Sequence, residues 1–260
     1  MKNRIILILI GLWISTISFS QKNEYQYIGL RFGASHGFSG TPDPNANKYL
    51  VTKDGDEMQA SPVSSYKGYT PGYVADFYYH FDFTTNNAGI ITGLEYNYGG
   101  LSSKYQTTPF ETSTTVYTMQ ETFRMHTVGV PIAFKYGPKI KKTQSYVFAG
   151  FQINYVVAIN SVQKYSWTTT PSALKLESGE YNKTAFNLFL GVNYRAFNLQ
   201  IDYYPSTVFN RNFDKNGYKV YDGMVKKYFD IKTSIKLAYG WLSDNSFWWK
   251  KKLRKVPFWK

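Results

Sequence analysis

The chain contains no cysteine among its 260 residues. This absence excludes disulfide bonds, thiolate metal sites and a lipid anchor on a processed N-terminal cysteine. The chain also lacks, after its first 20 residues, any apolar run of the roughly 20 residues that a transmembrane helix needs. Any passage through a membrane must therefore be made by β-strands.

Motifs that carry catalytic or metal chemistry are also scarce. No stretch has metal-ligand spacing or a glycine-rich phosphate-binding pattern. His126 has Thr127 and Glu121 nearby, but no serine lies two positions away to act as a nucleophile. We therefore expect no enzymatic activity, no cofactor and no metal. The histidines are His36, His80 and His126.

The N-terminal stretch MKNRIILILIGLWISTISFSQ has the order of features found in a secretory signal. Lys2 and Arg4 precede an apolar run over 5–17, and Ser18 and Ser20 stand three and one positions before Gln21. We expect residues 1–20 to be a cleaved signal peptide. A membrane anchor is the alternative, but the run is short for one.

What the chain has in excess is aromatic side chains. They make up 19% of the residues, with 24 Tyr and 19 Phe, and such amphipathic rings are enriched at membrane interfaces. A tyrosine-rich soluble β protein is the alternative that composition leaves open.

Eight segments alternate polar and apolar residues, which predicts β-strands with one wet and one apolar face. Long and short connections alternate between them, as in barrels that cross membranes. We therefore predict an all-β fold, an eight-stranded antiparallel up-and-down transmembrane β-barrel over residues 21–242. The segments are 25–38, 72–83, 89–101, 122–136, 145–160, 185–195, 197–205 and 228–241.

Glycine indicates which face of the strands points inward. An eight-stranded barrel is just wide enough for its own side chains, so its inner face needs small residues. Bulky residues such as Phe77, Ile132 and Leu190 would not fit there and are expected to face lipid. Pro131 lacks an N–H group, so we expect a bulge or break near it. The glycines on the polar positions are Gly29, Gly33, Gly37, Gly72, Gly89, Gly93, Gly99, Gly129, Gly150, Gly191 and Gly240.

The polar positions also carry charges of both signs, which predicts an ion-paired network inside the barrel. We expect this lumen network to be structural, and a path for protons or ions is the alternative. His80 is expected to join it. The cations are Arg31, Lys135, Arg195, Lys232 and Lys236, and the carboxylates are Asp76, Asp82, Glu95, Asp202 and Asp230.

Residues 243–260 form a basic, aromatic tail, which an even number of strands places on the periplasmic side with the N-terminus. We expect its rings and cations to bind anionic lipid headgroups. A protein partner and a solvated tail are the alternatives, and the compartment argues against nucleic acid. The residues concerned are Trp248, Trp249, Lys250, Lys251, Lys252, Arg254, Lys255 and Trp259.

Three stretches, HTVGVPIAFKYG, YVFAGFQINYVV and FNLFLGVNYRAFNLQIDYYPS, resemble the outer-membrane β-barrel domain family common in Bacteroidota, which includes the PorT-like proteins. The resemblance spans about residues 25–241. It implies an integral outer-membrane barrel, and for PorT-like members an association with type IX protein secretion.

Together these patterns predict a non-enzymatic outer-membrane barrel with a filled polar lumen. Its expected role is docking, adhesion or accessory work in protein secretion. Its expected partners are outer-membrane lipid and other outer-membrane or periplasmic proteins, reached through the long loops and the tail. A lipid A-modifying enzyme and a narrow pore are the alternatives.

Overall fold

In a computed structural model of the chain, the described residues are 26–39, 48–51, 57–63, 68–83, 87–107, 117–138, 145–166, 171–205, 208–215, 218–219, 228–241 and 254–255. The predicted signal peptide, residues 1–20, and most of the basic tail lie outside these residues. No helix in the described ranges is long and apolar enough to cross a membrane.

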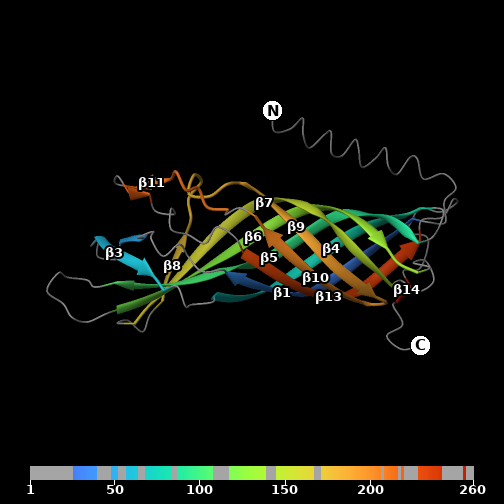
Figure 1. Ribbon diagram of the computed structural model, residues 1–260, viewed down its shortest axis with the longest axis horizontal. Coiled ribbons are helices and arrows are strands. Elements are labelled where there is room, and N and C mark those ends of the chain that lie inside the picture. The colour runs from blue at the N-terminus through green and yellow to red at the C-terminus, as the bar shows by residue number, and fades with distance from the viewer. Residues whose placement is uncertain are drawn as a thin grey trace.

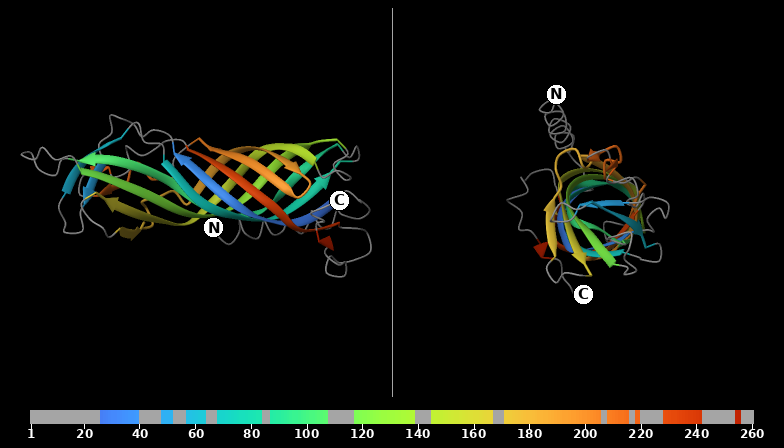
Figure 2. Two further views of the ribbon diagram at one scale, coloured as in Figure 1. Left: turned by 90° about the horizontal axis from the view of Figure 1, so that it is seen from below. Right: turned by 90° about the vertical axis from the view of Figure 1, so that its left-hand side faces the viewer.

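Eight of the described strands close into an antiparallel barrel (Figures 1 and 2). Each pairs with the next ring strand along the chain, and the last pairs with the first. This confirms the predicted up-and-down barrel. The ring strands are β1 (Gln26–Ser39), β4 (Gly68–Asp82), β5 (Ala88–Thr107), β6 (Tyr117–Tyr136), β7 (Ser145–Tyr165), β9 (Thr184–Tyr194), β10 (Phe197–Tyr204) and β13 (Tyr228–Trp241).

Three ring strands, β5, β6 and β7, continue past the ring at the long-loop end and form a projecting sheet. They extend beyond the predicted segments because alternate side chains stay buried there, against apolar residues of the loops. Short strands add to this sheet (Figure 1): β3 (Glu57–Pro62) pairs with β5, β2 (Lys48–Val51) with β3, and β8 (Ser172–Lys175) with β7.

Two more pairings lie outside the ring. One is the small sheet of β11 (Asp214–Lys215) and β12 (Tyr218–Lys219). The other is β14 (Arg254–Lys255), which pairs with the end of β13. Of the predicted tail residues, only these two have a described backbone, and the others lie outside the described ranges.

The apolar residues of the ring face outward and its charged residues face inward. Ile132 is 43% exposed and Leu190 is 61% exposed, whereas Lys135 and Lys236 are completely buried. Phe77 is half-buried on the outward side. The predicted assignment of the two faces is therefore confirmed.

Close backbone contact explains two of the glycines near the long-loop end. A Cβ atom on Gly37 of β1 would lie 2.0 Å from the carbonyl oxygen of Gly100 in β5. A Cβ atom on Gly100 would lie 1.8 Å from the carbonyl oxygen of Phe123 in β6. The sheet curls so tightly here that β1 meets β5 across β4. Glycine is needed here because one backbone contacts another. A backbone atom cannot move aside as a crowded side chain can, so this requirement for a small residue is stricter.

The break expected near Pro131 is present on one side of β6. The pairing of β5 with β6 runs through Thr92 and Ile132 and resumes at Glu95 and Gly129. The residues between them are unpaired in this ladder, because Pro131 has no N–H to donate. On its other side β6 pairs continuously with β7 through Pro131 and Gln152. The barrel wall is thus interrupted locally and remains closed.

Replacing Gly37 with alanine tests the close approach of β1 to β5. The added methyl would overlap a backbone oxygen that cannot move without shifting β5, so we expect Gly37→Ala to lower the free energy of unfolding by roughly 3 kcal/mol or prevent folding. Urea unfolding of the protein refolded in detergent micelles measures this. The control is Ala34→Val in the same strand, whose side chain faces outward and should change stability little. If Gly37→Ala and Ala34→Val were equally stable, the close approach of β1 to β5 would be contradicted.

Candidate functional site

The centre of the lumen is organised around the ammonium group of Lys232. This side chain comes from β13 and contacts Glu95 on β5, with Nζ 2.5 Å from Oε1, and also the carboxylate of Asp202 on β10. All three side chains are buried. They meet because each lies on an inward-facing position of its strand. One cation thus connects strands on opposite sides of the barrel.

Amide side chains complete the hydrogen bonding of these two carboxylates. Gln152 donates to Glu95 over 3.0 Å, and Gln200 donates to Asp202 over 2.7 Å. Gln152 also donates to Asn154 over 2.7 Å. Buried charges are tolerated when they are paired and their remaining lone pairs are occupied. These amides meet that condition.

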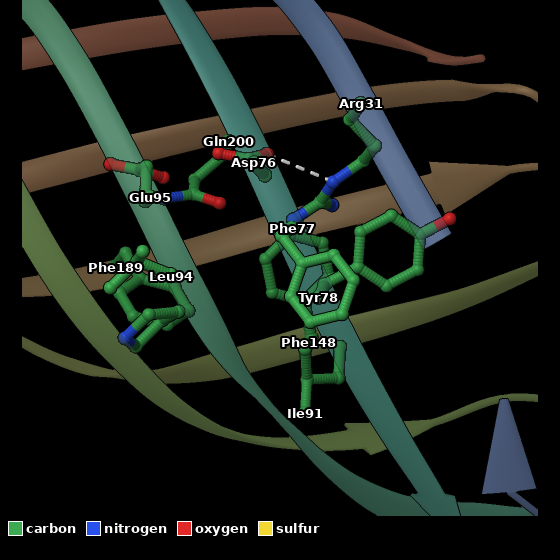
Figure 3. Close-up of a pocket in the computed structure, with 11 residues that line it drawn as sticks. Arg31, Asp76, Phe77, Tyr78, Ile91, Leu94, Glu95, Phe148, Phe189 and Gln200 are labelled. Carbon is green, nitrogen blue, oxygen red and sulfur yellow. Dashed lines mark ion pairs between the residues drawn. The ribbon is translucent and has the colours of Figure 1, made fainter. Parts of the chain in front are cut away.

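A second ion pair lies beside a small cavity next to this centre (Figure 3). Arg31 on β1 reaches Asp76 on β4, with Nε 3.0 Å from Oδ2. Its guanidinium carbon lies 4.7 Å from the centre of the Tyr78 ring, so a cation–π contact adds to the pair. The pair links two neighbouring strands of the ring.

A third group lies near the short turns. Lys135 on β6 forms an ion pair with Asp82 and donates to Nδ1 of His80 over 2.7 Å. The His80 ring is stacked on Tyr27 with centroids 4.1 Å apart, and Nζ of Lys236 lies 6.0 Å from the centre of that tyrosine ring. His80 therefore lies inside the barrel, next to Lys135 and Tyr27.

Asp230 is held by neutral donors. Ser35 and Asn97 donate to its carboxylate over 2.8 Å and 3.0 Å, and the backbone N–H of His36 donates over 2.9 Å. No cation of the described chain lies within ion-pair distance of Asp230. Three donors can stabilise a buried carboxylate in place of an opposite charge.

One predicted member of the network is misplaced. Arg195 lies in the turn between β9 and β10, exposed to solvent and with φ of 53°. The prediction that it faces the lumen is wrong, because the turn ends the alternation of β9 one residue earlier. The other ten predicted network residues point inward.

Sequence reasoning missed Glu121, which is buried on β6 and accepts hydrogen bonds from Ser161 over 2.8 Å and Gln163 over 3.0 Å. It lies on the same alternate positions as Lys135, so the pattern of β6 contained the signal. With Arg195 outside and Glu121 inside, the described lumen holds four cations and six carboxylates. The predicted equality of five and five is therefore wrong.

Apolar layers lie on both sides of the Lys232 centre, so the inner face of the barrel is not polar throughout. Toward the short turns a cluster contains Ile91, Ala133, Tyr146, Phe148 and Phe189. Toward the long loops a larger cluster, the apolar plug, contains Leu101, Tyr105, Met119, Phe123, Met125, Val156, Ile159, Leu176, Tyr204, Val208, Phe209 and Tyr228. The expectation of a wholly polar filling is corrected accordingly. Two cavities in the described lumen each have room for about one water molecule.

His80 and His126 lie on opposite sides of the barrel wall. His126 faces outward and its Nδ1 is 2.7 Å from the hydroxyl of Tyr96, whereas His80 is enclosed in the lumen. Within the described ranges, no group of three or more His, Asp or Glu residues could hold a metal ion.

Removing Lys232 tests the charged centre. We expect Lys232→Met to lower the free energy of unfolding by about 3–5 kcal/mol, because it leaves two buried carboxylates without their cation. Adding Glu95→Gln and Asp202→Asn to this variant should recover most of the loss, since no uncompensated charge then remains. Urea unfolding in micelles measures both variants, with exposed Lys164→Met as the control. If Lys232→Met were as stable as Lys164→Met, the ion pairs of Lys232 would not contribute to stability.

Comparison with known proteins places this geometry in a family. The model of the outer membrane protein beta-barrel domain matches residues 19–214. No curated protein sequence matches the chain. Among solved structures, the crystal structure of Ail, the attachment invasion locus protein of Yersinia pestis, in complex with the heparin analogue sucrose octasulfate, is similar at 11% identity and a TM-score of 0.35. That match covers 81% of this chain and 97% of Ail. By the family match, the chain belongs to the outer membrane protein β-barrel domain family and is a protein of the outer membrane.

Proposed function

We propose that this protein is a non-enzymatic docking component of the outer membrane that binds a partner protein at its long-loop end. The observation that supports this proposal is the projecting sheet of β5, β6 and β7, widened by β3 and β8. In outer-membrane barrels the longer loops are extracellular and the turns periplasmic. The projecting sheet is then the part that meets other molecules outside the cell.

The apolar plug supports the proposal because it makes this surface rigid. Phe209 packs edge-on against Phe123 of β6 with ring centroids 4.6 Å apart. The backbone N–H of Leu176 donates to Ile159 of β7 over 3.0 Å. A surface that is ordered before binding loses less conformational entropy when a partner docks.

The filled lumen argues against the narrow pore. Conduction needs a continuous aqueous path, and an eight-stranded barrel whose interior is filled by side chains leaves none. The outward environment of His126 argues against lipid A modification, because the imidazole is hydrogen-bonded to the hydroxyl of Tyr96 and the alternate residues on the same face, Arg124 and Val128, supply no serine or carboxylate.

Adhesion and secretion are two forms of the same proposal. In adhesion the partner belongs to another surface, and in secretion it belongs to the same cell envelope. The type IX secretion role implied by the PorT-like resemblance is one case of the second form. The identity of the captured partner distinguishes the two.

A charge-reversed surface tests the docking site. Lys164, Leu174 and Lys175 are exposed on β7 and β8. We expect the combined variant Lys164→Glu, Leu174→Asp and Lys175→Glu to fold normally and to recover roughly tenfold less partner from detergent-solubilised outer membranes, since a hot spot on such a surface contributes about 2 kcal/mol or more. Quantitative mass spectrometry of the pulldown measures recovery.

Two controls separate the possible outcomes. Arg195→Glu changes an exposed charge at the opposite end and should leave recovery unchanged. Removal of residues 243–260 tests the basic tail. If recovery falls only when the tail is removed, docking is periplasmic and the proposal is wrong. Steady conductance of the wild-type protein in planar bilayers would show that the protein is a narrow pore and would contradict the docking proposal.

A further inference from the structure

A set of outward-facing polar residues crosses four strands near the long-loop end, on the opposite side of the wall from the lumen network. In the strand registers, His36 on β1 pairs with Pro71 on β4, and Gly100 on β5 pairs with Arg124 on β6. The two pairs are connected because the guanidinium of Arg124 donates to the carbonyl oxygen of Pro71. We call His36, Arg124 and His126, with their tyrosine neighbours, the rim site.

The rim site lies where the outer surface changes from apolar to polar. On β6 the outward residues on the short-turn side of His126 are Val128, Val130 and Ile132, and those beyond Arg124 are Thr122 and Gln120. Such a change marks the edge of the hydrocarbon region, where aromatic girdles lie. With the long loops outside, this edge is at the headgroups of the outer leaflet.

Most of the guanidinium donors of Arg124 are not used within the described chain. Position 100 carries no side chain, so the guanidinium extends across β5, with its carbon 5.7 Å from the centre of the Tyr98 ring. Within the described part of the chain only one of its five donors has a partner, and no carboxylate there forms an ion pair with it. A partly exposed arginine at a membrane edge, without an acidic partner in the described chain, is suited to an anion from outside the protein.

Both histidines are held in the same way by a tyrosine. The hydroxyl of Tyr69 lies 2.8 Å from Nδ1 of His36, and the hydroxyl of Tyr96 lies 2.7 Å from Nδ1 of His126. When the hydroxyl donates to Nδ1, the imidazole proton is on Nε2, which then serves as an outward donor. Tyr98 connects the groups, with its ring 4.7 Å from that of His126.

We propose that the rim site binds a phosphate group of an outer-leaflet glycolipid, the phosphorylated disaccharide of lipid A. The free donors of Arg124 form a paired contact with the phosphate oxygens, and Nε2 of a neighbouring histidine adds a further hydrogen bond. The tyrosine rings lie in the headgroup layer beside the sugar. In this proposal the rim site binds the lipid without altering it.

A defined lipid and a matched pair of variants test this site. The full mature chain is refolded in detergent micelles with purified diphosphorylated lipid A or the same lipid without its phosphates, and bound lipid is counted by native mass spectrometry. We expect the wild type to bind the diphosphorylated lipid at least roughly tenfold more tightly than the dephosphorylated one, as hydrogen bonds to charged groups imply. Arg124→Gln should lose this preference. Lys164→Gln, which removes a cation of the projecting sheet, should retain it.

Two further arms make the result specific. Arg124→Lys keeps the charge without the paired donors, so it should bind with intermediate affinity. Circular dichroism and urea unfolding confirm that each variant is folded. A second variant, His126→Gln, removes the imidazole of the rim site and leaves Arg124 in place. Equal binding of both lipids by the wild type, or displacement of the lipid by inorganic phosphate at equal concentration, would overturn the proposal.

Discussion

The constraint on which the structure depends is that a strand in hydrocarbon cannot leave its backbone N–H and C=O groups unpaired. A sheet meets this demand only by closing on itself. With eight strands the closed interior is just wide enough for its own side chains. From this follow the outward apolar band, the inward charges and the need for glycine where backbones approach, as at Gly37 and Gly100. The break at Pro131 is tolerated because β6 remains paired with β7 on both sides of this residue.

The charged centre specifies which strands meet and in which register. A buried ion pair gives little net stability over well-packed apolar residues, but breaking one is costly. Since a slip of one residue turns every side chain of a strand to the other face, Lys232 finds Glu95 and Asp202 only in the correct register. The apolar layers on both sides keep water from this centre. The lumen network therefore helps to fix the register of the strands in the barrel.

Much of this fold could be predicted from the sequence, because alternation is a local property that each strand carries. The eight segments and the inward positions of Lys232 and Asp76 follow from it directly. The predictions that were wrong concern residues near the ends of strands. Arg195 looked inward by parity, but the two-residue turn places it outside. Met119 and Phe123 belong to parts of β6 where the inner face is apolar, which only contact with the distant Val208 and Phe209 explains. The rim site depends on residues from four strands that no local pattern brings together.

The central claim is that the apolar face of each strand contacts lipid while the charged face is sealed inside. Since the chain has no cysteine, single cysteines at Leu188, Leu190 and Val192 of β9 can carry spin labels in reconstituted liposomes without background. Collision with lipid-soluble oxygen and with a water-soluble nickel chelate then reports the environment of each label. We expect frequent collisions with oxygen and rare collisions with nickel at all three positions. Frequent collisions with nickel there would mean that water covers this face, which would contradict the central claim.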